Sequence, residues 1–413
     1  MASASQRARE GFRSKKPSGV FLTVPESPDA YKLIASGTFV EGDLTVTKHG
    51  LVINPGSANG HENSGVSGNG DVGSAVASAR LAAVPPSPPS PSSSSGGGVA
   101  GAAGSSEFGT LSLDDLTVLG TIGAGSSGVV QRVTHKQTKQ TFALKLIQVE
   151  MAQQARKQLC TELRTLSGAL HANVVTFHHA FTDKGCVSIL MEYMDAGSLF
   201  DVLKQKKRLP EHHIATVAAQ VLAGLQYLHK ELRVVHRDVK PSNLLVNRQG
   251  LIKISDFGVS GQVANSMSKC ATWVGTVTYM SPERISGKPY SFDSDLWSLG
   301  LTLFECAVGQ FPYARTADGS SGDACESPPA PLGFWDLLDR IVTKPPPRLE
   351  EHSSFSFSNE LRDLVSLSLQ KEPDSRCTAA ELLSHAFVAP VLASSGESKA
   401  RREELAAFIT GSL

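Results

Sequence analysis

The sequence predicts an α+β fold of two unequal lobes, a smaller strand-rich part followed by a larger helix-rich part, behind a disordered N-terminal extension. Three observations carry this prediction. Short β-branched and aliphatic runs, bounded by Gly or polar clusters, lie between residues 116 and 149. Long apolar segments of helical length dominate after Gly197. Before both, the segment from Asn54 to Thr110 consists mainly of Gly, Ala, Ser, Pro and Asn.

Each element follows from its local pattern. The strings LTVLGTIGAG and TFALKLIQV predict two strands. Residues 152–170 carry four leucines at spacings of four, three and four, which predicts an amphipathic helix. HHIATVAAQVLAGLQYLH and SDLWSLGLTLFECAVG predict long, mostly buried helices. Near the C-terminus, SKARREELAAFI predicts a charged helix that is solvated and peripheral.

Composition divides the 413 residues into four parts. Residues 1–53 form an N-terminal arm. Residues 54–110 contain too little bulky apolar surface to offset the entropy of ordering them, so we expect a disordered linker. Residues 116–388 form the globular region, and residues 389–413 form a C-terminal tail.

Charge and cysteine usage exclude several classes of protein. Lys+Arg and Asp+Glu each number 39, so a nucleic-acid binder held by bulk charge is not expected. No apolar run is long enough to span a bilayer, and the N-terminus lacks the apolar core of a signal peptide, so we expect no membrane insertion. Six scattered cysteines without a CxxC pair indicate neither a zinc site nor a disulfide framework, and favour a cytoplasmic or nuclear location.

A glycine-rich string, IGAGSSGVV, stands between two predicted strands. Gly123, Gly125 and Gly128 match GxGxxG, whose missing side chains let the backbone cover nucleotide phosphates. An ordinary flexible hairpin is the alternative. A dinucleotide-binding Rossmann site would require a helix directly after the glycines, whereas the strand-like VVQRV follows here.

Lys145 lies within the next apolar strand. Such a lysine either extends to the surface along its aliphatic stem or holds the α- and β-phosphates of a nucleotide. In the second interpretation Glu162, on the flank of the leucine stripe of the following helix, pairs with Lys145. Taken alone, Glu162 is equally an exposed helix carboxylate.

The strongest signal is HRDVKPSN at residues 236–243. Its five fixed positions arise by chance on the order of once in ten thousand sequences of this length. Asp238 can accept the proton of an attacking hydroxyl, Lys240 can neutralise charge on the transferred phosphoryl group, and Asn243 can ligate Mg²⁺. Farther along the chain, Asp256 of a DFG triplet can hold Mg²⁺ across the β- and γ-phosphates.

Three further residues have structural roles in this interpretation. Glu283 belongs to the string SPE, which follows the DFG triplet, and Arg376 is its expected buried partner. Asp295, in the apolar helix SDLWSLG, is expected to be buried and to hold the backbone of the catalytic loop.

Together these strings resemble a eukaryotic protein kinase over about residues 116–388. The resemblance implies a two-lobed protein kinase fold with a β-rich N-lobe and a helical C-lobe, and ATP with Mg²⁺ as cofactors. HRDVKPSN implies Ser/Thr-type machinery. Carried over residue by residue, the family's nucleotide pocket comprises, besides the glycines and Lys145, Ile122, Val130, Ala143, Met191, Glu192, Met194 and Leu245.

The strings DFGVSGQ, VGTVTYMSPER and MEYMDAGSL resemble MAP kinase kinases, which phosphorylate both Thr and Tyr of a TxY motif. This resemblance implies a downstream MAP kinase as substrate and an upstream MAP kinase kinase kinase as activator. Ser266 and Thr272 show the plant-type phosphosite spacing, whereas Ser268 and Thr272 show the animal-type spacing. Either pair would carry activating phosphates that dock on Arg237; the alternative is that these are ordinary polar loop residues.

Residues 13–24 resemble the docking motif of MAP kinase activators. A basic cluster, a spacer and two hydrophobic residues suit an extended segment lying in a groove beside an acidic patch, and a solvated basic tail is the alternative. The residues concerned are Arg13, Lys15, Lys16, Leu22 and Val24.

Residues 36–53 also resemble the segment that precedes the kinase domain in plant-type members. Two features depart from the family pattern, a Pro/Ser-rich insertion at 314–333 and the long linker at 54–110. The long linker argues against a fixed role for the N-terminal arm. Two other functions remain open, a general Ser/Thr kinase of the sterile-20 type and a catalytically silent kinase-fold scaffold that tethers a MAP kinase.

Overall fold

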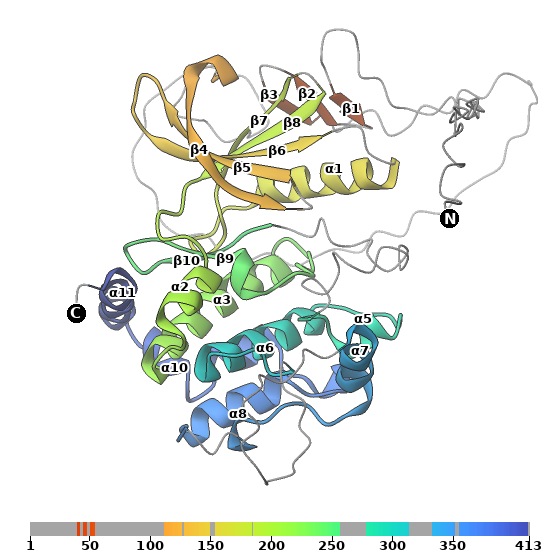
Figure 1. The fold of residues 1–413 in the computed structure, drawn as a ribbon, viewed down its shortest axis with the longest axis vertical. Helices are drawn as coiled ribbons and strands as arrows, with labels where there is room; N and C mark the ends of the chain where they lie inside the picture. The colour runs from red at the N-terminus through yellow and green to blue at the C-terminus, as the bar shows by residue number, and fades with distance from the viewer. Residues whose placement is uncertain are drawn as a thin grey trace, which may run out of the picture.

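The computed structural model has a smaller lobe built on an antiparallel sheet and a larger helical lobe, as the sequence predicts (Figure 1). The following ranges are described: 39–41, 44–47, 50–53, 111–125, 128–148, 153–183, 185–256, 278–313, 333–351 and 355–411.

Five antiparallel strands form the N-lobe sheet in the order β4-β5-β6-β8-β7. Their bounds are β4 Leu116–Gly125, β5 Gly128–His135, β6 Thr141–Gln148, β7 Phe177–Asp183 and β8 Cys186–Glu192. Both strands predicted between residues 116 and 149 are confirmed as β4 and β6. β7 is an edge strand of this sheet, so its outer side is available to other elements.

Helix α1 (Gln153–Gly168) packs beside this sheet through the predicted leucine stripe. Leu159, Leu163 and Leu166 are buried, which confirms the amphipathic pattern. Leu170 lies beyond the end of the helix and is 80% exposed, so the stripe is one residue shorter than expected.

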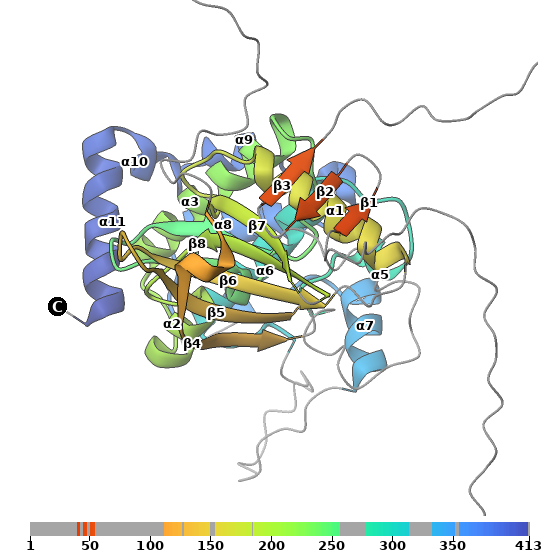
Figure 2. The same cartoon turned by 90° about the horizontal axis from the view of Figure 1, so that it is seen from above.

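A second, three-stranded sheet precedes the linker, with antiparallel strands in the order β1-β2-β3. The strands are β1 (Phe39–Glu41), β2 (Leu44–Thr47) and β3 (Gly50–Ile53). Figure 2 shows this N-terminal sheet beside α1, and it also packs against β7. The expectation that the arm has no fixed role is therefore wrong for strands β1, β2 and β3, which are part of the N-lobe.

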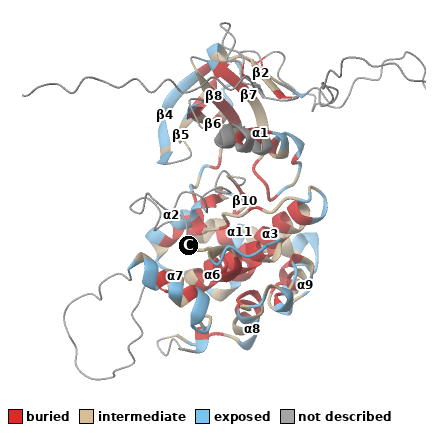
Figure 3. Cartoon of the chain, turned by 90° about the vertical axis from the view of Figure 1, so that its right-hand side faces the viewer, coloured by how far each residue is buried: buried red, intermediate tan, exposed pale blue. Residues whose placement is uncertain are grey.

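The C-lobe is built around α3 (Glu211–Lys230) and α6 (Asp293–Val308), which confirm the two long buried helices predicted from the sequence. Burial is concentrated in these helices (Figure 3). The other C-lobe elements are α2 Leu199–Lys206, β9 Leu244–Val246, β10 Ile252–Ile254, α5 Pro282–Ile285, α7 Phe334–Thr343, α8 Asn359–Ser368 and α9 Ala379–Leu383.

The C-terminal tail forms α10 (Ala389–Leu392) and α11 (Ser395–Thr410). The predicted helix is therefore confirmed, but its predicted solvated position is wrong. α11 packs on α3 and buries Leu405 and Ile409, because two apolar residues one turn apart present a single face to the C-lobe.

Several predicted segments lie outside the described residues. They are the docking motif, the linker at 54–110, the three activation phosphosites and most of the insertion at 314–333. In the part of the chain that is described, no helix combines the length and apolarity needed to cross a membrane.

Candidate active site

The catalytic loop lies between α3 and β9, and its three predicted residues converge. Asp238 Oδ2 is 2.8 Å from Lys240 Nζ and accepts a 2.8 Å hydrogen bond from Asn243 Nδ2. Asn243 Nδ2 also donates to the backbone oxygen of Asp238, at 2.8 Å. Because the amide nitrogen points back to Asp238, the asparagine is held in one orientation. The carboxylate of Asp238 is therefore held in place by Lys240 and Asn243 of the same loop.

Asp295 supports this loop from beneath, as the sequence analysis expected. It is fully buried in α6, and its two oxygens accept 2.8 Å hydrogen bonds from the backbone N–H groups of His236 and Arg237. Burial by itself raises the pKa of Asp295, but the hydrogen bond from His229 and the charges nearby hold that pKa below its ordinary value. A charged acceptor therefore fixes Arg237, whose φ of 73° is unfavourable for a residue with a side chain.

Lys145 and Asp256 meet across the site. Lys145 is 3% exposed in β6, and its Nζ lies 2.6 Å from Asp256 Oδ1. Burial raises the pKa of Asp256, but the nearby Lys145 outweighs it, so that the pKa of this carboxyl is lower than usual. The predicted partner Glu162 belongs to α1, but its side chain lies outside the described residues, so the pairing of Glu162 with Lys145 stays a prediction.

The glycine-rich string covers the end of β4 and the start of β5, which pair at Gly125 and Gly128, and residues 126 and 127 lie outside the described part. A strand follows the glycines, so the Rossmann alternative is wrong. At Gly128, with φ at +121°, a Cβ would stand 2.2 Å from the backbone oxygen of Leu146. Gly128 is thus required by the close approach of β6, independently of any nucleotide.

The predicted nucleotide-pocket residues come from five strands and the connection between the lobes. Ala143 of β6 pairs with Met191 of β8, and Gly123 pairs with Val130 across the β4–β5 hairpin. Leu245 lies in β9 on the other lobe. Ile122 is half exposed in β4, whereas Met194 is buried in the connection. Their roles toward a nucleotide stay predictions.

Glu192 has a partner that sequence reasoning missed. Its Oε2 lies 2.6 Å from Nζ of the buried Lys253 in β10, and it accepts a 3.3 Å hydrogen bond from Thr176 N. The carboxylate therefore connects the two lobes. The one available signal was a lysine between two isoleucines in a buried strand.

Arg376 and Glu283 form the buried pair that was expected. Arg376 Nη1 and Nη2 lie 3.0 and 3.2 Å from the two carboxylate oxygens of Glu283. Arg376 also donates to the backbone oxygens of Asp293 and Gln370, at 2.8 and 3.1 Å. This pair joins α5 to the start of α6 and to the segment between α8 and α9.

Arg237 is the predicted receiver of the activating phosphates. Its Nε is buried and has no hydrogen-bond partner among the described residues, while its guanidinium lies over the ring of Tyr290. Arg284 Nη1 donates to the backbone oxygen of Arg237 at 2.6 Å. Two guanidinium groups therefore lie together where the activation segment rejoins the described chain.

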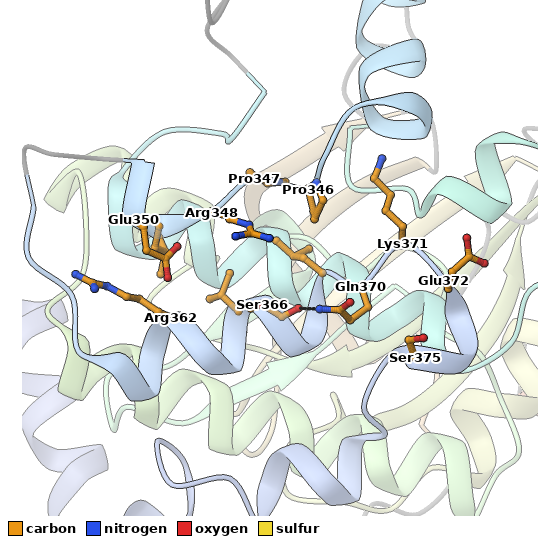
Figure 4. A pocket seen from close by; sticks show the side chains of 13 residues that line it. Pro346, Pro347, Arg348, Glu350, Arg362, Ser366, Gln370, Lys371, Glu372 and Ser375 are labelled. Atoms are coloured by element: carbon orange, nitrogen blue, oxygen red, sulfur yellow. Dashed lines mark hydrogen bonds between the residues drawn. The ribbon is translucent and has the colours of Figure 1, made fainter. Parts of the chain in front are cut away.

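A separate pocket of about 310 Å³ lies on the C-lobe (Figure 4). Pro346, Arg362 and Lys371 are among the residues that line it. None of its lining residues belongs to the predicted catalytic or nucleotide-binding sets. The described part of the chain holds no cluster of three or more His, Cys, Asp or Glu side chains suited to a metal ion.

This fold and this arrangement of lysine, aspartates and asparagine define a class of enzyme, and comparison with known proteins agrees. Residues 116–388 match the protein kinase domain family, so the chain is an ATP-dependent protein kinase. It is 46% identical over 282 residues to mitogen-activated protein kinase kinase 2 of Arabidopsis thaliana, covering 67% of this chain and 73% of that protein.

Two further relatives extend the comparison. Mitogen-activated protein kinase kinase 1 of Arabidopsis thaliana is 39% identical over 376 residues, covering 90% of this chain and 91% of that protein. The dual specificity mitogen-activated protein kinase kinase dSOR1 of Drosophila melanogaster is 44% identical over 294 residues, covering 68% of this chain and 72% of that protein. The chain belongs to the MAP kinase kinase family of eukaryotic protein kinases.

Proposed function

We propose that this kinase transfers the γ-phosphate of ATP to both Thr and Tyr of a TxY activation loop in a MAP kinase. The observation that carries the proposal is the convergence of Asp238, Lys240 and Asn243, set against the Lys145–Asp256 pair. Relatives whose names include dual specificity MAP kinase kinase support the choice of substrate.

Each residue has a role that its position suits. Asp238 accepts the proton of the substrate hydroxyl, and Lys240, 2.8 Å away, neutralises charge on the phosphoryl group in flight. Lys145 holds the α- and β-phosphates, and Glu162 orients Lys145. Because Asp238 orients the hydroxyl and does not hold ATP, Asp238→Asn should abolish transfer while nucleotide binding persists.

Two oxygen donors suit a magnesium ion. The side chain of Asp256 is 40% exposed. The Nδ2 of Asn243 donates to Asp238, whereas its Oδ1 accepts a long 3.5 Å hydrogen bond from the Ser242 hydroxyl, so Oδ1 is the amide atom suited to bind a cation. Carboxylate and amide oxygens are the ligands that Mg²⁺ prefers. When bound, the ion neutralises charge on the β- and γ-phosphates.

We infer that an upstream MAP kinase kinase kinase activates the enzyme by phosphorylating Thr272 together with Ser266 or Ser268. The support is Arg237, whose buried Nε lacks a hydrogen-bond partner in the described structure. A phosphate there would gain charge-assisted hydrogen bonds and order the activation segment. Cytoplasmic or nuclear location stays a prediction.

The docking motif adds substrate selectivity in this proposal. Arg13, Lys15 and Lys16 would meet an acidic patch, while Leu22 and Val24 fill apolar pockets. Removing residues 1–24 should slow phosphorylation of a full-length MAP kinase but leave a short TxY peptide unaffected.

The test is phosphorylation of a MAP kinase activation loop by the purified, activated protein, with Asp238→Asn as the inactive control. Mass spectrometry should find phosphate on both Thr and Tyr. Phosphate on Thr alone would identify a general Ser/Thr kinase of the sterile-20 type. Equal phosphorylation by the wild type and Asp238→Asn would refute the catalytic assignment.

A further inference from the structure

The N-terminal sheet, formed by β1, β2 and β3, buries more apolar surface than it can enclose by itself. Phe39, Leu44 and Val46 are each 0% exposed, although the sheet consists of three strands of three or four residues. A sheet this small has no interior of its own. Its buried face must therefore be covered by the N-lobe.

Contacts with β7 and α1 identify the covering surface. β2 and β3 lie against the edge strand β7, and β1 lies against α1 (Figures 1 and 2). Thr182 of β7 donates a buried hydrogen bond from Oγ1 to the backbone oxygen of Val46, at 3.1 Å. At Gly50 the backbone comes so close to β7 that a Cβ would stand 2.8 Å from His179 Nε2.

The sheet thus spans two elements that the kinase site depends on. β7 belongs to the main sheet, which carries Lys145 on β6. Helix α1 carries Glu162, and its inner residues Leu159, Cys160 and Leu163 are buried in the same core as Phe39 and Leu44. A body packed on both elements restrains how α1 rotates or shifts against the sheet.

We propose that the N-terminal sheet, β1 to β3, is a brace that holds α1 in its catalytic position against β7, acting separately from the predicted docking motif at residues 13–24. The brace residues touch neither ATP nor substrate, so they are positioning residues. Their effect reaches the reaction through α1, whose placement decides whether Glu162 orients Lys145.

The first experiment measures amide hydrogen exchange in the full-length protein carrying Leu44→Ala and Val46→Ala. Truncating two fully buried side chains should raise exchange in α1 about tenfold while α6, in the other lobe, is unchanged. Thr45→Ala is the matched control, because Thr45 lies on the opposite face of the same strand. Unchanged exchange in α1, or an equal rise in α6, would overturn the proposal.

A second pair of variants probes the contact with β7. Gly50→Ala should reproduce the faster exchange, because its methyl group would meet His179, and Gly50→Ala with His179→Ala should partly restore protection. Gly120→Ala is the control, since Gly120 also has positive φ but a Cβ there meets nothing within 4 Å. Equal effects of Gly50→Ala and Gly120→Ala would show that backbone strain, and not the contact, is responsible.

The third readout is catalytic and uses a peptide substrate that has no docking groove. The kcat of the Leu44→Ala, Val46→Ala variant should fall about five- to tenfold with little change in the KM for peptide, and the more conservative Leu44→Met should retain activity. An unchanged kcat would refute the link to catalysis. Only this readout depends on the proposed substrate. The hydrogen-exchange measurements therefore test whether the brace restrains α1 even if the substrate assignment is wrong.

Discussion

Replacement of Arg376 by Met should destabilise the C-lobe strongly, because it leaves a charge buried without its partner. The side chain of Arg376 is 0% exposed and that of Glu283 is 3% exposed. Removing one member of such a pair costs about 3–5 kcal/mol of unfolding free energy. For a domain of this size each kcal/mol lowers Tm by about 2–4 °C, so we expect a drop of roughly 10 °C.

The size of the effect depends on what remains around Glu283. In the variant the hydroxyl of Ser294 remains in place, with its Oγ 2.8 Å from Glu283 Oε1, and the Ser281 side chain and the Glu283 backbone also donate to the carboxylate. Burial raises the pKa of Glu283, but the hydrogen bonds from Arg376 and Ser281, the charge of Arg376 and a backbone hydrogen bond together outweigh it, so the pKa is below its ordinary 4.5. The pair's stabilisation is therefore present at neutral pH and is lost as the pH falls below about 4.5.

The assay is urea unfolding followed by tryptophan fluorescence, since Trp297 lies 5.5 Å from the guanidinium of Arg376. The double variant Arg376→Met with Glu283→Gln removes the stranded charge and should be about 2 kcal/mol more stable than the sum of the two single effects predicts. Arg401→Met is the control, because its 2.9 Å pair with Glu397 is partly exposed and should contribute about 0–1 kcal/mol. Additive effects, or a loss at Arg376 no larger than at Arg401, would refute the reasoning.

The sequence was most informative where chemistry requires fixed residues at short spacing. Asp238, Lys240 and Asn243 lie within six positions of one another, so the loop that brings them together is set locally. Asp295 and Arg376 were also placed correctly, since a charged residue in an apolar helix or a short buried segment needs a partner.

Packing between residues far apart in the chain could not be predicted from local sequence patterns. The pair of Lys253 with Glu192 joins residues 61 positions apart, and no spacing rule relates them. The N-terminal sheet was missed because its strands are very short, and β7, which covers Leu44 and Val46, is far away along the chain. For α11 the charges were visible in sequence, whereas the face that packs on α3 is set by tertiary contact.

Three further predictions address the tail and the arm. Gly250→Ala should lower the free energy of unfolding by about 2–4 kcal/mol in urea, because φ is +71° and a Cβ would stand 2.0 Å from a backbone oxygen of α11. In the control Gly287→Ala, φ is +67° but a Cβ meets nothing within 4 Å, so this variant should lose only the smaller free energy due to backbone strain. Equal losses in the two variants would contradict a role for the contact with α11. Burial beneath α11 lowers the pKa of His213 from 6.5 to about 4, so this histidine stays neutral in the folded protein while it takes up a proton in the unfolded chain. The free energy of unfolding should therefore fall as the pH drops from 6.5 toward 4. Between pH 7 and pH 5 the wild type should lose about 1–2 kcal/mol that His213→Leu does not lose, and parallel curves would refute the assignment. The last prediction follows from the N-terminal sheet, which packs on the N-lobe and is separated in sequence from the proposed docking motif by the segment 25–38. A flexible tether of that length spans about 20 Å, whereas a tether running through the linker at 54–110 as well would average about 50 Å. Deleting half of that linker should therefore leave the phosphorylation rate of a full-length MAP kinase unchanged at subsaturating concentration, while a long Gly/Ser insertion within 25–38 should slow it several-fold by lowering the effective concentration of the docked target. If the linker deletion and the insertion change the rate equally, the sheet does not separate the two segments, and the docking motif acts through the whole extension.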